Sequence, residues 1–170
     1  MKATFSHDKP LLFEIAIMKH RLPIFLAFFL FAVPVFAQSV DFGKREPLTI
    51  ETSAGAFSFL VEIADTTEKR SQGLMFREVM RHDHGMLFDF KETRPVAMWM
   101  ANTILPLDMV FINPDGTVRR IERNTKPFSR DIVTSGGPVS HVLELNAGTA
   151  LQINLKEGDR IFHRFFGDAG

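Results

Sequence analysis

The chain of 170 residues contains no cysteine, no tyrosine and only one tryptophan, and it carries no excess of charge of either sign. Without cysteine no disulfide can stabilise the fold, so an apolar core must hold the domain together. Eighteen phenylalanines and an apolar fraction of 45% supply the bulk of such a core. The 20 basic residues balance 20 acidic ones without a dense basic patch, which argues against nucleic acid as a partner.

No apolar run reaches the roughly 20 residues that a membrane-spanning helix needs. The longest run, residues 22–35, follows the basic start Met18-Lys19-His20-Arg21 and ends at Val35-Phe36-Ala37. This pattern predicts a signal peptide over residues 18–37, cleaved before Gln38, and hence a periplasmic or secreted protein. Residues 1–17 precede a complete signal, and we interpret them as a non-native extension. The alternative is an uncleaved segment that anchors the protein in the membrane, the only membrane contact that we expect.

The remainder, a lead-in over 38–47 and a single domain over 48–170, has the pattern of a β protein. Alternating apolar and polar residues predict about nine short strands, among them 96–101 and 151–155, which is typical of a sandwich or barrel. Asn113-Pro114-Asp115-Gly116 predicts a turn. One short helix is expected, capped by Asp65 or Thr66 and ended by Gly73. Prolines and glycines predict a long loop over 125–138. We therefore predict an all-β fold, a jelly-roll-like sandwich or barrel with one short helix.

The segment 98–108 holds the only tryptophan and sets polar residues inside apolar sequence. Buried polar groups need partners or a role in a site, because an unpaired one costs roughly 1–3 kcal/mol. A ligand could lie on the indole while the polar groups supply donors and acceptors. The predicted ligand-binding residues are Trp99, Asn102, Thr103, Asp108 and Arg77, and the expected ligand is a small polar molecule such as an envelope glycan. In the alternative, structural interpretation, Asn102 and Thr103 satisfy loop backbone, and Asp108 caps a turn or pairs with Arg77.

Four motifs in order resemble the bacterial and archaeal family called domain of unknown function 192. They are Gln72-Gly73-Leu74-Met75-Phe76-Arg77, Gly85-Met86-Leu87-Phe88, Trp99-Met100-Ala101-Asn102-Thr103 with Pro106-Leu107-Asp108, and Val142-Leu143-Glu144-Leu145 with Gly148 and Gly158-Asp159. The resemblance covers residues 48–166 and implies a compact jelly-roll sandwich with a small helix, often exported. It implies no chemistry. Ala101 stands where the family usually has a basic residue, and His84 where it more often has an acidic or small one.

Two other functions have some support in the sequence. A soft-metal site for Cu(I) could use His82, His84, Met86, Met98 and Met100, with Trp99 as a cation–π face. Against it, methionines beside apolar strands more often fill a core, and histidines in a charged loop are more often solvated.

An envelope hydrolase could use Asp108 as general base with His84 or Asp83 as its partner. Neither Ser53 nor Ser135 stands in a Gly-x-Ser-x-Gly motif, however. Glu62 and Glu144 each lie between apolar neighbours on a predicted strand, which is the usual pattern of a solvated face. We therefore favour a binding module over an enzyme, and expect no cofactor and a monomer or weak oligomer.

Overall fold

The computed structural model describes residues 40–166. The predicted extension and signal peptide, residues 1–37, lie outside this range. None of the helices within it is long and apolar enough to cross a membrane.

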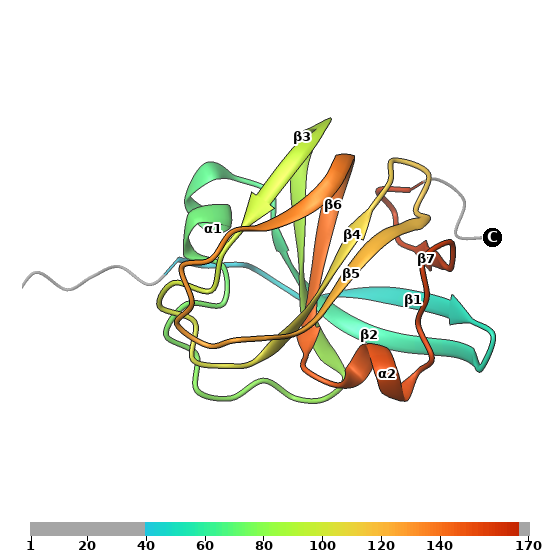
Figure 1. The fold of residues 1–170 in the computed structure, drawn as a ribbon, viewed down its shortest axis with the longest axis horizontal. Helices are drawn as coiled ribbons and strands as arrows, with labels where there is room; N and C mark the ends of the chain where they lie inside the picture. Colours follow the sequence, from blue (N-terminus) through green and yellow to red (C-terminus); the bar gives the residue numbers. More distant parts are fainter. Residues whose placement is uncertain (1–39, 167–170) are drawn as a thin grey trace, which may run out of the picture. The chain divides into compact units, whose positions relative to one another are not determined.

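Seven strands form one mixed sheet that is curled into a half-barrel, accompanied by two very short helices (Figure 1). In chain order the elements are β1 (Glu46–Thr52), β2 (Gly55–Ala64), α1 (Thr67–Gln72), β3 (His84–Met98), β4 (Leu107–Ile112), β5 (Val118–Thr125), β6 (Val133–Asn146), α2 (Thr149–Gln152) and β7 (Arg160–Phe162). The sheet order is β5-β4-β6-β3-β2-β1-β7. The mainly β prediction is confirmed, whereas the jelly-roll sandwich is not the arrangement found, because a single sheet curls instead of two sheets packing face to face.

The curl of the sheet brings its two opposite edges, β5 and β7, into contact where β5 begins. Thr117 and Arg160 form an isolated bridge there. The backbone N–H of Ile161 also donates to the carbonyl of Gly116 at 2.9 Å. A Cβ atom at Gly116 would lie 2.5 Å from the Ile161 carbonyl oxygen, so this close approach requires glycine, which also adopts a φ of 84°.

The helix α1 links β2 to β3, the only parallel pair of strands in the described sheet. The Thr66 hydroxyl caps it by accepting the backbone N–H of Lys69 at 3.2 Å, as predicted. Gly73 ends it with a φ of 48°, and a Cβ there would lie 3.2 Å from the ring of Phe88. Glycine thus lets the end of the helix pack close to β3.

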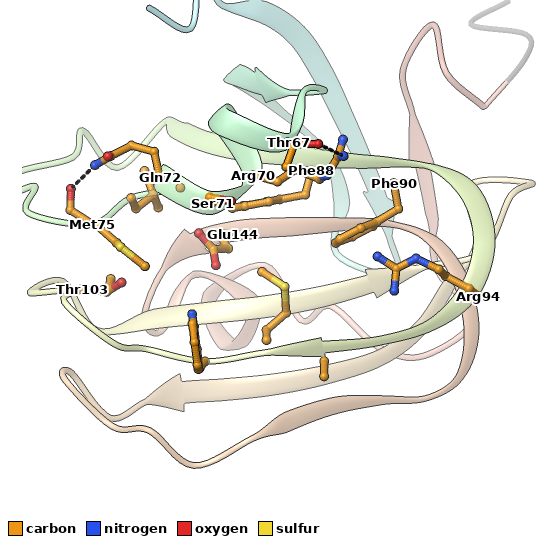
Figure 2. A pocket seen from close by; sticks show the side chains of 15 residues that line it. Thr67, Arg70, Ser71, Gln72, Met75, Phe88, Phe90, Arg94, Thr103 and Glu144 are labelled. Carbon is orange, nitrogen blue, oxygen red and sulfur yellow. Dashed lines mark hydrogen bonds between the residues drawn. The ribbon is translucent and has the colours of Figure 1, made fainter. Parts of the chain in front are cut away.

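The long strands β3 and β6 form a bent antiparallel ribbon. Lys91 has a positive φ of 64°, and the register shifts between Asp89 and Arg94 and again between Pro95 and Ala97. These irregularities bend β3 because an extra residue on one strand breaks the ladder locally. As a result, residues from both halves of β3 line one cavity (Figure 2).

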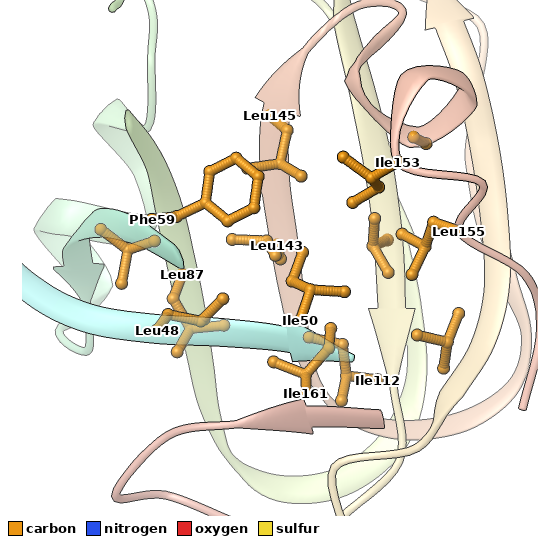
Figure 3. Close-up of a cluster of buried hydrophobic side chains, with 14 of the residues drawn as sticks. Leu48, Ile50, Phe59, Leu87, Ile112, Leu143, Leu145, Ile153, Leu155 and Ile161 are labelled. Atoms are coloured by element: carbon orange, nitrogen blue, oxygen red, sulfur yellow. The ribbon is translucent and has the colours of Figure 1, made fainter. Parts of the chain in front are cut away.

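Both faces of the sheet are buried. The first core contains Leu143 and Leu145 of β6 together with side chains of β1, β2, β4 and β7 (Figure 3). The second core lies on the opposite face and contains Val142 of β6 with Met86, Phe88 and Met109. Successive residues of a strand point to opposite faces, so Glu144 belongs to the face of the second core.

Three predicted elements differ from the structure. The strand predicted over 96–101 ends at Met98. The loop predicted over 125–138 contains the first residues of β6, because Val133, Thr134 and Pro138 pair with the second half of β3. The strand predicted over 151–155 is instead α2 and a following turn with Asn154 at a φ of 54°.

Candidate functional site

A cavity of about 430 Å³ opens between α1, the two halves of β3 and the segment that follows β3 (Figure 2). This volume lies within the roughly 300–1,000 Å³ of small-molecule pockets. Its apolar walls are formed by Leu74, Met75, Phe88, Phe90, Ala97, Met98 and Trp99, and its polar lining by Thr67, Arg70, Ser71, Gln72, Arg94, Thr103 and Glu144. The composition, apolar with a few polar groups, is typical of a ligand site.

Glu144 is the only carboxylate in the lining of this cavity. It stands on β6 between Met86 of β3 and Met109 of β4, which are its neighbours across the sheet. Its side chain is 4% exposed. Burial raises the pKa of this carboxyl to about 8, and no donor or cation within residues 40–166 offsets the effect. Glu144 is therefore mainly protonated at pH 7, and it presents an acid without a protein partner to the cavity.

The prediction of a solvated face for Glu144 was wrong. Its neighbours Val142, Leu143 and Leu145 are all fully buried, so both faces of β6 are covered. The sequence did contain a signal of this burial, because apolar residues at both the odd and the even positions of a strand indicate that both of its faces are covered. A single acid in a strand that is apolar on both faces therefore indicates a site and not a solvated face.

Two of the predicted ligand-binding residues line the cavity. Trp99 follows β3 directly and is 54% exposed, so part of its indole remains accessible at the wall. Thr103 is 5% exposed, and its hydroxyl lies 3.4 Å from the carbonyl oxygen of Ala101. The structure thus brings Trp99 and Thr103 together with Glu144.

Asn102 and Asp108 do not line the cavity. Asn102 has a positive φ of 59°, which asparagine tolerates, and its carbonyl accepts the backbone N–H of Phe76 at 2.9 Å. Asp108 is fully buried and accepts the backbone N–H groups of Asn124 and Ala150, each at 2.8 Å. Both of its oxygens are engaged with main chain, and it faces the side of the sheet opposite to Glu144.

Arg77 lies in a second hollow of about 270 Å³. There it forms a two-pronged ion pair with Glu62, and Arg45 contacts the same carboxylate at 2.6 Å. Glu62 is 6% exposed, so the prediction that it lies on a solvated face was also wrong. Burial alone would raise the pKa of Glu62, but the two guanidinium groups more than offset this and lower it. Arg77 thus has a partner within the protein.

The residues of the soft-metal alternative do not share one cavity. His84 lines the hollow around Glu62, whereas Met98 lines the cavity around Glu144. Met86 and Met100 are buried in the second core, and His82 is exposed. Over residues 40–166, histidine and acidic side chains form no group of three suited to a metal ion.

A third, shallow hollow contains Ser140, His141 and Asp89. The Ser140 hydroxyl lies 2.8 Å from His141 Nδ1, and His141 Nε2 lies 3.6 Å from Asp89. The second distance is too long for the hydrogen bond that orients a catalytic histidine, and Asp89 instead contacts Lys91 at 2.8 Å. Burial lowers the pKa of His141 to about 4, so this histidine is neutral at pH 7.

Two phenylalanines that are hydrogen-bonded to residues 102–103 have strained backbone conformations. Phe76 and Phe128 adopt positive φ angles of 64° and 60°, although both side chains are exposed. Their backbone N–H groups donate to the carbonyls of Asn102 and Thr103, at 2.9 and 3.1 Å. Bulky residues rarely adopt this conformation, which costs of the order of 1–3 kcal/mol each, and such strain is concentrated at functional sites.

Comparison with known proteins gives a family but no activity. A family model named DUF192, "Uncharacterized ACR, COG1430", matches residues 49–163, and no curated protein matches the chain. A crystal structure from Sinorhizobium meliloti, described as that of a proposed transcription regulator, has 49% sequence identity and a TM-score of 0.70, over 74% of this chain and 97% of that one. A protein of unknown function from Novosphingobium aromaticivorans has 33% identity and a TM-score of 0.68, over 70% and 85% of the two chains. The chain therefore belongs to the DUF192 family.

Proposed function

We propose that this domain is a binding module for a small polar ligand, held in the cavity between α1 and β3. Trp99 would supply a flat apolar wall, and Thr103 and Glu144 would supply hydrogen-bonding groups. The predicted export would place it in the cell envelope, where glycans and other small polar molecules are available. The proposal needs neither Asp108 nor Arg77, because both are engaged within the protein.

The carboxyl of Glu144, which has no partner among residues 40–166, is the observation that carries this proposal. A polar group buried without a hydrogen bond costs the fold roughly 1–3 kcal/mol. Methionine would fill the same position without that cost, as it does on the two neighbouring strands at Met86 and Met109. A nearly buried acid that faces an open cavity and pairs with no described residue is a strong candidate for ligand binding.

One relative is described as a proposed transcription regulator. Recognition of a small effector would be compatible with a regulatory role, and the cavity would serve it equally well. The balance of 20 basic and 20 acidic residues gives no electrostatic support for direct contact with DNA.

The single tryptophan provides a direct test, because all indole fluorescence of the protein comes from the cavity wall. The purified full chain would be titrated with monosaccharides, N-acetylated amino sugars, amino acids and short peptides. We expect at least one class to change the emission of Trp99 and to raise the melting temperature. Glu144→Leu should abolish both effects, whereas Glu51→Gln, an exposed acid on β1, should preserve them.

Binding that survives Glu144→Leu undiminished would refute this use of the cavity. So would the absence of any response to all four classes of compound.

A further inference from the structure

Resting on the proposed function, we infer that the cavity selects a zwitterion of the amino-acid type, with its ammonium group at Glu144 and its carboxylate at Arg70. Both residues line the same cavity, one on its strand side and one on α1 (Figure 2). Neither residue forms an ion pair with another of the residues 40–166.

The carboxyl of Glu144 is nearly buried. Only 4% of Glu144 is exposed to solvent, and no cationic side chain within residues 40–166 pairs with it. Arg94 also lines the cavity, but its guanidinium contacts Glu92 at 3.0 Å and lies over the ring of Phe90. Without a cation the buried acid stays protonated, and its ionised form would be stabilised by one. Residues 40–166 provide none, so a cationic group of the ligand could take this place.

Arg70 shows the complementary feature. Its guanidinium donates to the backbone carbonyl of Asp89 at 2.9 Å and lies 3.5 Å from the Thr67 hydroxyl. Neither group is charged, and none of the described carboxylates forms an ion pair with Arg70. An arginine held by neutral acceptors retains donors that can bind a carboxylate.

The walls favour an organic cation over a hard metal ion. Phe88, Phe90 and Trp99 offer aromatic surface, and Met75 and Met98 offer thioethers. Aromatic faces attract ammonium groups by cation–π interactions. A hard cation such as Ca²⁺ needs six or more oxygen ligands, whereas Glu144 is the only carboxylate in the lining.

Ligand binding should also be coupled to a proton. Burial raises the pKa of Glu144 to about 8, so an ammonium group must displace the proton of the free acid at pH 7. Among the other charged groups near Glu144, Glu62 is paired with Arg45 and Arg77, Glu122 with Arg120, and Arg94 with Glu92. Arg70 has only neutral acceptors. The affinity for the zwitterion should therefore rise with pH, by up to about tenfold per pH unit, until the pH passes 8.

A series of ω-amino acids from glycine to 6-aminohexanoate tests the inference, because each added methylene group increases the separation of the two charges. Each would be titrated against the full chain by Trp99 fluorescence at pH 6, 7 and 8, beside the n-alkylamine and the fatty acid of equal length. We expect one chain length to bind at least tenfold more tightly than its amine and its acid. Its affinity should rise with pH, and calorimetry in two buffers should show the release of a proton.

Two charge-removing variants assign the ends of the ligand. Glu144→Gln should make the zwitterion bind no more tightly than the fatty acid of equal length, and should also remove the pH dependence of the affinity. Arg70→Gln should remove its advantage over the amine but leave the pH dependence in place. Glu51→Gln serves as the control, and circular dichroism confirms that each variant is folded.

Equal binding of zwitterion, amine and acid would overturn the inference, as would a pH dependence that survives Glu144→Gln. If sugars change Trp99 fluorescence while the whole amino-acid series fails to do so, the inference falls and the proposed function stands. If neither set of compounds binds, both are refuted.

Discussion

Asp108 and Glu144 occupy adjacent register positions on neighbouring strands and face opposite sides of the sheet, since Asp108 pairs with Leu145 and Glu144 pairs with Met109. Both acids are buried. Asp108 accepts two backbone N–H groups, whereas Glu144 has no partner among residues 40–166. One acid therefore supports the fold, and the other is available to a ligand.

Replacing Asp108 should destabilise the protein. In Asp108→Asn the amide can accept only one of the two backbone N–H groups, and its own NH₂ group faces the other donor. We expect a loss of about 3 kcal/mol in the free energy of unfolding, because each lost hydrogen bond to a charged group is worth roughly 1.5–3 kcal/mol. Urea denaturation measures this loss, with the exposed Asp131→Asn as control. Equal midpoints for Asp108→Asn and the wild type would show that the two contacts contribute nothing.

Glu144 should make the protein less stable as the pH rises. Its pKa is about 8 in the folded state and 4.5 ordinarily, so between these values the folded state holds more protons. The free energy of unfolding then decreases with pH, by up to about 1.4 kcal/mol per pH unit. Glu144→Gln cannot ionise and lacks this dependence. Urea denaturation at pH 5.5, 7 and 8.5 should show that the free energy of unfolding of the variant increases relative to that of the wild type as the pH rises. A difference between the two proteins that does not change with pH would contradict the prediction.

His141 should make the protein more stable as the pH rises from 4 to 6.5, which is opposite to the effect of Glu144. Burial is the main cause that lowers its pKa to about 4; Asp89 opposes the shift, while His163 and Lys91 add to it. Between pH 4 and 6.5 the unfolded state holds the extra proton, so the stability contribution is complete above pH 6.5 and is lost as the pH falls. His141→Gln should flatten the slope of unfolding free energy against pH in this range. An unchanged slope would indicate that His141 does not titrate there.

Phe128 offers a gain in stability. It is 62% exposed and has a φ of 60°, so it carries backbone strain with little compensating burial. Asparagine tolerates this conformation, and Phe128→Asn should raise the free energy of unfolding by about 1 kcal/mol. Differential scanning calorimetry measures the effect. For comparison, Ile132→Asn, exposed on the same connection, should bring no gain.

Local signals were sufficient to predict local structure. We predicted that α1 begins at Asp65 or Thr66 and ends at Gly73, and its caps are Thr66 and Gly73. Asn113-Pro114-Asp115-Gly116 forms the predicted turn, with the Gly116 N–H donating to the Asn113 carbonyl at 3.0 Å. In each case the residues that determine the conformation are neighbours in the sequence. The family resemblance likewise depended on ordered motifs, and the match over residues 49–163 confirms it.

Features that depend on distant partners could not be predicted in the same way. Ser135 to Pro138 looks like a loop, but pairing with the bent half of β3 makes it part of a strand. Leu151 and Ile153 alternate as in a strand, but Asp108 accepts the N–H of Ala150 and stabilises the first turn of α2. The positive φ of Asn102 changes the direction of the chain, so spacing alone could not show that Thr103 lines the cavity and Asp108 does not.

The contact between β5 and β7 also affects how this domain behaves towards other polypeptides. An edge strand with free N–H and C=O groups can recruit a strand from another molecule and begin aggregation. Where Thr117 and Arg160 pair, and where Ile161 donates to Gly116, these groups are already occupied. This end of the sheet is thereby protected from intermolecular strand addition, without any covalent cross-link.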